Sequence, residues 1–204
     1  MHMLDREDEL QGVGRTPWFY LRNLAVSFCV YSVVGHWIEI IYCSFMNIFG
    51  IVAEDSLVWD DPFYPFLVYG VGVAVCEIFL VPLKQLLIKR CKKLSIAVWL
   101  FFLIAVVVTM LMEIGMGLML NQPDPITGEY PLWDNSQLPF NVLAQAWLVN
   151  DIGFGIIATL YTWVLFPLTV RAIEKVPVRV MNVASVLVVV GFIMLCVVKF
   201  SAPV

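Results

Sequence analysis

The sequence predicts an all-α membrane protein with five transmembrane helices. Of its 204 residues, 61% are hydrophobic and 14% are charged, and the mean hydropathy is +0.90. Soluble domains average about 45–50% apolar and about 25% charged residues. Five apolar segments are long enough to cross a bilayer, and the basic residues gather on one side of them. These observations exclude an ordinary soluble domain.

A segment of about 20 residues crosses a hydrocarbon core of about 30 Å, at 1.5 Å per residue. The expected spans are Leu24–Met46, Phe63–Leu83, Ile96–Leu120, Val142–Leu168 and Val180–Val198. Residues 1–23 precede them as a cytoplasmic segment, and residues 180–198 form an added fifth helix. Pro82 and Pro167 lie near the ends of the second and fourth spans, where a missing N–H is best tolerated.

The basic residues set the expected orientation. Eleven of the twelve fall before the first span or in the second and fourth connections: Arg6, Arg15, Arg22, Lys84, Lys89, Arg90, Lys92, Lys93, Arg171, Lys175 and Arg179. Lys199 is the exception. The first and third connections are acidic and contain no lysine or arginine. The positive-inside rule therefore predicts a cytoplasmic N-terminus and an external C-terminus, in a multi-pass protein of the bacterial inner membrane.

An internal repeat relates residues 38–78 to residues 112–152 at an offset of 74. The matches include Glu39 with Glu113, and Glu77 with Asp151 as an acid for an acid. Each unit contains a span, an outer loop and a returning span, so both copies have the same orientation. We expect a parallel repeat within residues 24–168, with residues 24–83 and 96–168 as its two hairpins.

Four acidic residues lie inside the expected spans: Glu39, Glu77, Glu113 and Asp151. An ionised carboxylate at the bilayer centre costs roughly 2.5–3.5 kcal/mol on insertion scales. Counting residues from the outer ends of the spans places three of them in one outer-half layer, with Glu77 deeper. The four acids are therefore candidates to line a polar pathway or to bind a cation or a cationic substrate. A neutral, hydrogen-bonded structural core is the alternative.

His36 and Glu39 are three residues apart and share a helix face. They could form a proton relay or a cation-binding pair, or satisfy each other locally. A metal site is not expected, because no second histidine or cysteine pair is placed to complete it.

The acidic outer loops carry two repeated Trp-Asp pairs, Trp59-Asp60 and Trp133-Asp134, which are candidates to hold these loops together. The third connection, residues 121–141, is long and rich in proline and aromatic residues. We expect it to form an ordered cap on the outer face.

The sequence contains no phosphate-binding glycine loop, nucleophile elbow, zinc-protease motif or dinucleotide-binding glycine pattern. We therefore expect neither an enzyme nor a cofactor, and no nucleic-acid partner.

Several runs resemble the bacterial putative ABC-transporter type IV permeases. They are residues 31–39 (YSVVGHWIE), 65–72 (PFLVYGVG), 112–115 (MEIG), 133–136 (WDNS) and 139–141 (PFN). The resemblance covers about residues 25–170. In this sequence Asn135 stands where the family usually has tyrosine, and Asp151 replaces an uncharged stretch.

The resemblance implies a small inner-membrane protein that acts in transport, as a permease-like subunit. Its candidate partners are the lipid bilayer, a separate ATPase subunit and a second copy of the chain. Two other functions stay open from the residues alone. One is a non-transporting assembly or sensing module with a structural polar core, and the other is a self-contained proton- or cation-coupled carrier.

Overall fold

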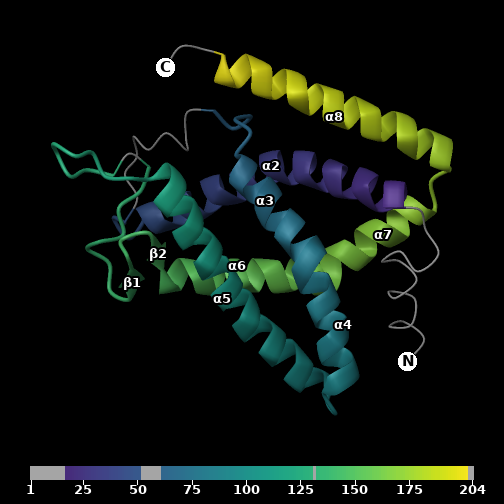
Figure 1. Ribbon diagram of the computed structural model, residues 1–204, viewed down its shortest axis with the longest axis horizontal. Coiled ribbons are helices and arrows are strands. Elements are labelled where there is room, and N and C mark those ends of the chain that lie inside the picture. Colours follow the sequence, from purple (N-terminus) through teal and green to yellow (C-terminus); the bar gives the residue numbers. More distant parts are fainter. Residues whose placement is uncertain (1–16, 52–60, 131, 202–204) are drawn as a thin grey trace. The chain divides into compact units, whose positions relative to one another are not determined.

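The computed structural model describes residues 17–51, 61–130 and 132–201 and confirms an all-α protein with five long apolar helices (Figure 1). The helices are α2 (Pro17–Asn47), α3 (Leu67–Val75) continuing through the π-helical η2 (Cys76–Leu80) into α4 (Val81–Arg90), α5 (Leu94–Leu120), α6 (Leu148–Leu160) continuing through the π-helical η3 (Tyr161–Leu165) into α7 (Phe166–Glu174), and α8 (Val178–Phe200). Two short strands, β1 (Asn141–Val142) and β2 (Ala146–Trp147), pair antiparallel. The five continuous helices are 23 to 31 residues long, which is enough to cross a bilayer.

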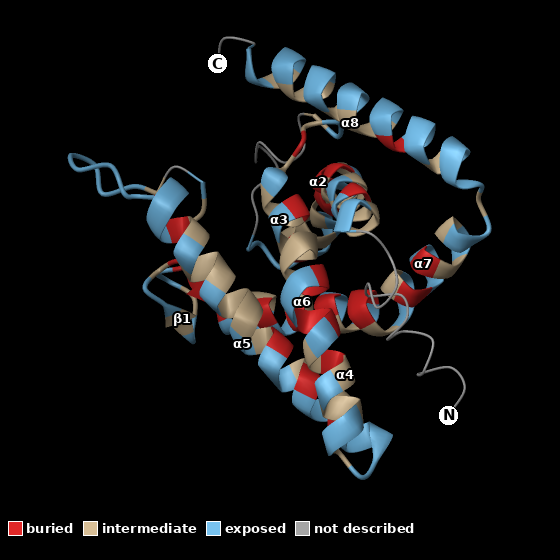
Figure 2. Ribbon diagram, turned by 45° about the vertical axis from the view of Figure 1, so that its right-hand side comes forward, coloured by how far each residue is buried: buried red, intermediate tan, exposed pale blue. Residues whose placement is uncertain are grey.

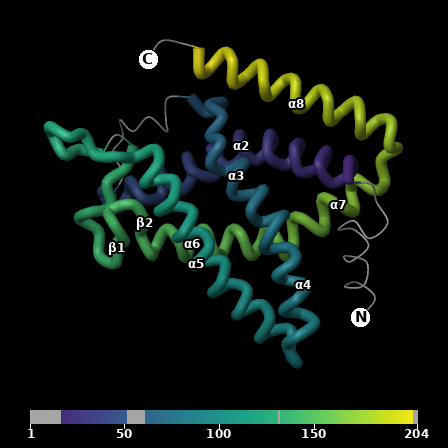
Figure 3. The backbone as a smooth tube through the Cα atoms, in the orientation of Figure 1, coloured from purple at the N-terminus to yellow at the C-terminus, as the bar shows by residue number. Residues whose placement is uncertain are grey.

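The chain forms two compact units, which we describe separately. The first unit is residues 1–77 with 169–204, and the second unit is residues 78–168. In the first unit α2 packs against α3 and α8, and in the second unit α5 packs against α6, α4 and β2. The trace in Figure 3 shows the tight reversal between α4 and α5, which takes three residues, 91–93.

The exposed surface of the helices is largely apolar, as the burial colours of α8 in Figure 2 illustrate. Val186 and Leu187 on α8 are 60% and 68% exposed. Such a surface would be unfavourable in water but suits contact with lipid chains, whose polarity matches that of leucine and valine. The exposure pattern therefore agrees with a multi-pass membrane protein.

Glycines allow the helices of each hairpin to approach closely. In the first unit a side chain at Gly70 would overlap Ser32 of α2, and in the second unit a side chain at Gly155 would overlap Val106 of α5. Small residues at helix contacts are the usual means of tight packing in membranes.

Several helix ends differ from the sequence-based expectation. The fourth span was expected from Val142, but α6 begins at Leu148, because residues 141–147 form the β1–β2 hairpin instead. The first span begins at Pro17 rather than Leu24, and proline is favoured at the first helical position because its missing N–H needs no partner there. The second helix runs to Arg90, so Lys84 lies inside it rather than in a connection. Trp59 and Asp60 lie outside the described residues.

Prolines explain the two π-helical segments. Pro82 and Pro167 follow η2 and η3 closely, and neither can donate a backbone hydrogen bond. In η3 the N–H of Phe166 bonds the carbonyl of Tyr161, which is the wider i→i+5 pattern. The carbonyl of Thr162 is thereby left without a backbone donor, because its own i+5 residue is Pro167.

Candidate functional site

Glu113 and Asp151 come together in the second unit. Glu113 projects from α5, and Asp151 lies in the first turn of α6, the helix that packs most extensively against α5. The two carboxyl groups lie within hydrogen-bonding range of each other. The structure therefore joins two of the four acids that the sequence singled out.

Asp151 is fully buried, at 0% exposure. Both of its carboxylate oxygens, and Oε2 of Glu113, have no hydrogen-bond donor among the described residues. The Glu113 carboxyl also accepts hydrogen bonds from the backbone N–H of Trp147 and the side chain of Asn150. One side of Glu113 is thus anchored, while the other faces Asp151.

The pair cannot be fully ionised without a counter-charge. Ionised carboxylates only accept hydrogen bonds, so two that face each other repel and also lose their hydration. A proton or a cation between them would remove both penalties. The chemical capacity of this site is therefore to hold a positive charge.

His36 and Glu39 form a looser arrangement in the first unit. His36 is fully buried and stacks on Phe66, with ring centroids 4.4 Å apart. Its Nε2 lies 3.0 Å from the carbonyl oxygen of Asp61, and because a carbonyl only accepts, Nε2 carries the proton. Nδ1 then faces Oε2 of Glu39 at 3.8 Å, and neither atom has another partner among the described residues. The Tyr69 hydroxyl donates to the Glu39 carboxyl.

Glu77 is buried in η2, away from Glu39. Tyr69, which bonds Glu39, precedes it by eight residues, or about 12 Å along the helix. Glu39 and Glu77 belong to the first unit, and Glu113 and Asp151 to the second. The single layer of three acids accordingly stays a prediction.

The two hairpins correspond in different registers along their two helices. Glu39 and Glu113 are 74 residues apart, but η2 with Pro82 and η3 with Pro167 are 85 residues apart. In the second register Glu77 aligns with Thr162 rather than with Asp151. Ser32–Gly70 and Val106–Gly155 are contacts related in the same way, at 74 on the first helix and 85 on the second. The gapless match of Glu77 with Asp151 is therefore replaced.

The loop between α5 and α6 is an ordered, hydrogen-bonded cap built around Asn121 and Gln145, which are both buried. Asn121 Nδ2 donates to the Trp133 carbonyl at 2.7 Å and to Gln145 Oε1 at 3.0 Å, and its Oδ1 accepts from the Leu132 N–H at 2.9 Å. Trp133 Nε1 donates to the Gln145 carbonyl at 2.9 Å. Of the two loop candidates, Trp133 joins this network.

Asp134 has a local role. Its side chain is exposed in structure and accepts a hydrogen bond from the Ser136 N–H, as in a turn. Asn121 and Gln145 were not singled out from the sequence. A polar residue at each edge of an apolar segment was the available signal.

Lys84 is a second residue that sequence reasoning missed. It is 1% exposed, and its Nζ donates to the Thr162 carbonyl at 3.1 Å, the carbonyl that Pro167 deprives of a backbone donor. The ammonium also lies 5.6 Å from the centroid of the Trp163 ring. Lys84 therefore satisfies a helix defect within the second unit.

Lys199, the basic residue that departs from the orientation pattern, is paired with Asp61 at 2.5 Å. The ammonium lowers the pKa of the Asp61 carboxyl below its usual value, chiefly through the hydrogen bond between them. The pair ties the end of α8 to the loop before α3.

A family model of transporters covers most of this chain. The model described as putative ABC-transporter type IV matches residues 26–200. The chain belongs to this family.

Membership in the putative ABC-transporter type IV family confirms the resemblance inferred from the sequence motifs, and the matched region contains all four buried acids. No curated protein and no solved structure matches the chain. The roles of individual residues in this family member must therefore be argued from its own geometry.

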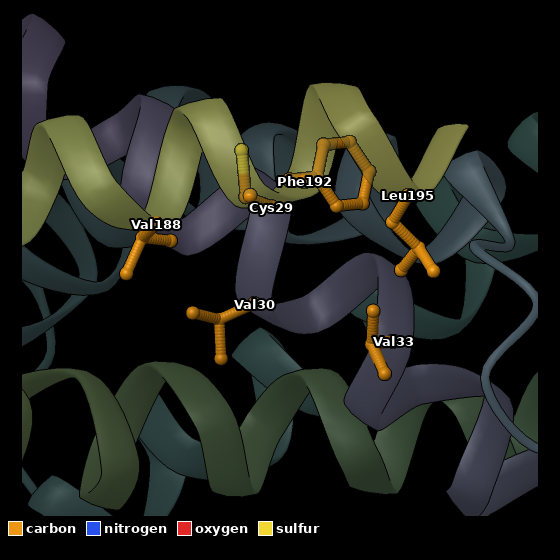
Figure 4. Close-up of a pocket in the computed structure, with 7 residues that line it drawn as sticks. Cys29, Val30, Val33, Val188, Phe192 and Leu195 are labelled. Atoms are coloured by element: carbon orange, nitrogen blue, oxygen red, sulfur yellow. The ribbon is translucent and has the colours of Figure 1, made fainter. Parts of the chain in front are cut away.

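A separate pocket of about 210 Å³ lies between α2 and α8 in the first unit (Figure 4). Its lining includes Cys29, Val33, Val188 and Phe192, and none of the predicted site residues. Among the described residues no group of three or more histidine, cysteine or acidic side chains is arranged to hold a metal ion. The acid pair of this family member is thus a site for a single charge rather than a multidentate metal centre.

Proposed function

We propose that this chain is the membrane-embedded, permease-like subunit of a transporter in the bacterial inner membrane, and that its buried acids line a polar site. The observation that carries the proposal is the Glu113–Asp151 pair. Its burial between apolar helices, without a donor between the facing oxygens, is costly for a purely structural core. Intramembrane ionisable residues of this kind usually mark substrate or ion pathways.

Family membership supports a separate ATPase as the partner. The connections that would face it are short, with three residues between α4 and α5 and three between α7 and α8. The basic ends of the helices, with Lys92 and Lys93 between α4 and α5, would then supply the contact. Such a surface suits a partner with an acidic docking face.

The test is affinity purification of the tagged chain from its native host, with identification of co-purified proteins by mass spectrometry. We expect an ATPase subunit in the wild-type sample, and its loss from the Lys92→Glu/Lys93→Glu variant. Glu129→Lys, an exposed change in the α5–α6 loop, is the matched control and should retain the partner. Absence of any ATPase from the wild-type sample would remove the ABC mechanism and leave the self-contained carrier.

A homo-oligomer is the second proposed association. Five helices in one chain enclose little space, and a second copy would supply the remaining wall of a path. Light scattering of the purified chain in detergent would show the expected dimeric mass.

A further inference from the structure

We propose that the Glu113–Asp151 pair is a proton-binding site that holds one exchangeable proton between its two carboxyl groups at neutral pH. The inference names the ligand of the polar site. Its use in transport rests on the proposed function, whereas the presence of the proton does not.

The hydrogen-bond count of the site requires an added hydrogen. Asp151 has two oxygens and Glu113 has one, Oε2, that are buried and lack a donor among the described residues. The two carboxyl groups nevertheless lie within hydrogen-bonding range. One proton on either group converts two repelling acceptors into a donor and an acceptor.

The surroundings offer no other positive charge. Glu113 is the one ionisable side chain of α5, and Asp151 is the one ionisable carboxyl of α6. The strands β1 and β2 carry none. On α4, Lys84 is directed to Thr162, eleven residues beyond Asp151 and about 16 Å along the helix.

The proton is preferred over a metal ion because the site is small in ligands. The Asn150 side chain and the Trp147 N–H donate hydrogens toward Glu113, and donors oppose a cation at the same place. A sodium or calcium ion would need about five to eight oxygen ligands, and the pair provides three free oxygens.

Single amide substitutions imitate the protonated pair. In Glu113→Gln, the side-chain amide donates a hydrogen to the Asp151 carboxylate, and the pair keeps one negative charge. Asp151→Asn does the same in the opposite sense. Both variants should fold, because hydrogen bonding and net charge are preserved.

Infrared spectroscopy of the purified full chain in lipid nanodiscs tests the site. We expect the neutral-pH wild-type spectrum to contain a carboxylic acid C=O stretching component that disappears in alkaline buffer. Glu113→Gln and Asp151→Asn should each lack this component, and the exposed Glu129→Gln should retain it.

Three results would overturn the proton site. They are absence of a component specific to the pair, its persistence in both single variants, or its appearance in the wild type only after sodium and potassium are replaced by choline. The last result would show a metal cation in place of the proton. A positive infrared result without a co-purified ATPase would leave the proton site intact and refute the ABC function. The reverse pair of results would do the opposite.

Discussion

Replacing Asn121 by alanine should open the cap between α5 and α6. The side chain is 0% exposed and makes three well-formed hydrogen bonds of 2.7, 2.9 and 3.0 Å, to Trp133, Leu132 and Gln145. A shorter apolar side chain removes all three and leaves their partners buried without replacements.

The magnitude follows from that count. A typical intramolecular hydrogen bond contributes about 0.5–1.5 kcal/mol net, so three give about 3 kcal/mol. For a chain of this size, each kcal/mol shifts Tm by about 2–4 °C. We therefore expect Asn121→Ala to lower Tm by about 6–12 °C.

Thermal unfolding in detergent, followed by circular dichroism, measures this shift, and limited proteolysis of the loop shows whether the cap opens first. Gln122→Ala is the matched control, because its exposed side chain bonds only the Leu118 carbonyl among the described residues. Equal Tm values for wild type and Asn121→Ala, or equal losses in both variants, would refute the reasoning.

Two further perturbations test the packing and the surface charges. Gly155→Ala should lower thermal stability, because its Cβ would overlap Val106, whereas Gly153→Ala, which meets nothing within 4 Å, should be neutral or slightly stabilising; equal effects would contradict the close approach. The depressed pKa of Asp61 means that its pairing with Lys199 contributes stability at neutral pH that is lost as pH falls through the folded-state pKa. Asp61→Asn should flatten this acid limb of the unfolding profile by at most about 1 kcal/mol, since the pair is near the surface. An unchanged acid limb in the variant would show that the pairing contributes nothing.

The sequence was sufficient for the five helices because hydrophobic length dominates in a membrane protein. It misplaced the start of α6 because residues 142–147 are as apolar as a span. Their conversion into a hairpin depends on Gln145 and Asn121 pairing across the cap. Left-handed backbone at Phe140, Leu143 and Ala144 has no residue-type signature, since none of them is glycine.

For the candidate site, the acids could be named from the sequence but their pairing could not. Depth counting grouped Glu39 with Glu113 and Asp151, whereas the contact that the structure shows is between Glu113 and Asp151 alone. The gapless repeat also matched Glu77 with Asp151, because a difference in loop length leaves no trace in helices made of similar apolar residues. Lys84 was assigned to a connection because lysine is costly inside a span, and the carbonyl that accepts its hydrogen bond is created by Pro167, far along the chain.

The π-helical segments η2 and η3 change which side of the helix each residue presents. One extra residue in a turn rotates everything beyond it by roughly 100° relative to a regular α-helix. Residues before and after Cys76–Leu80, or Tyr161–Leu165, therefore follow two different phases of a helical wheel. A scan of cysteine or tryptophan substitutions along either helix would show a periodic accessibility pattern that slips once, at the π-helical segment. Lipid-facing positions deduced from one half of such a helix should not be extended to the other half.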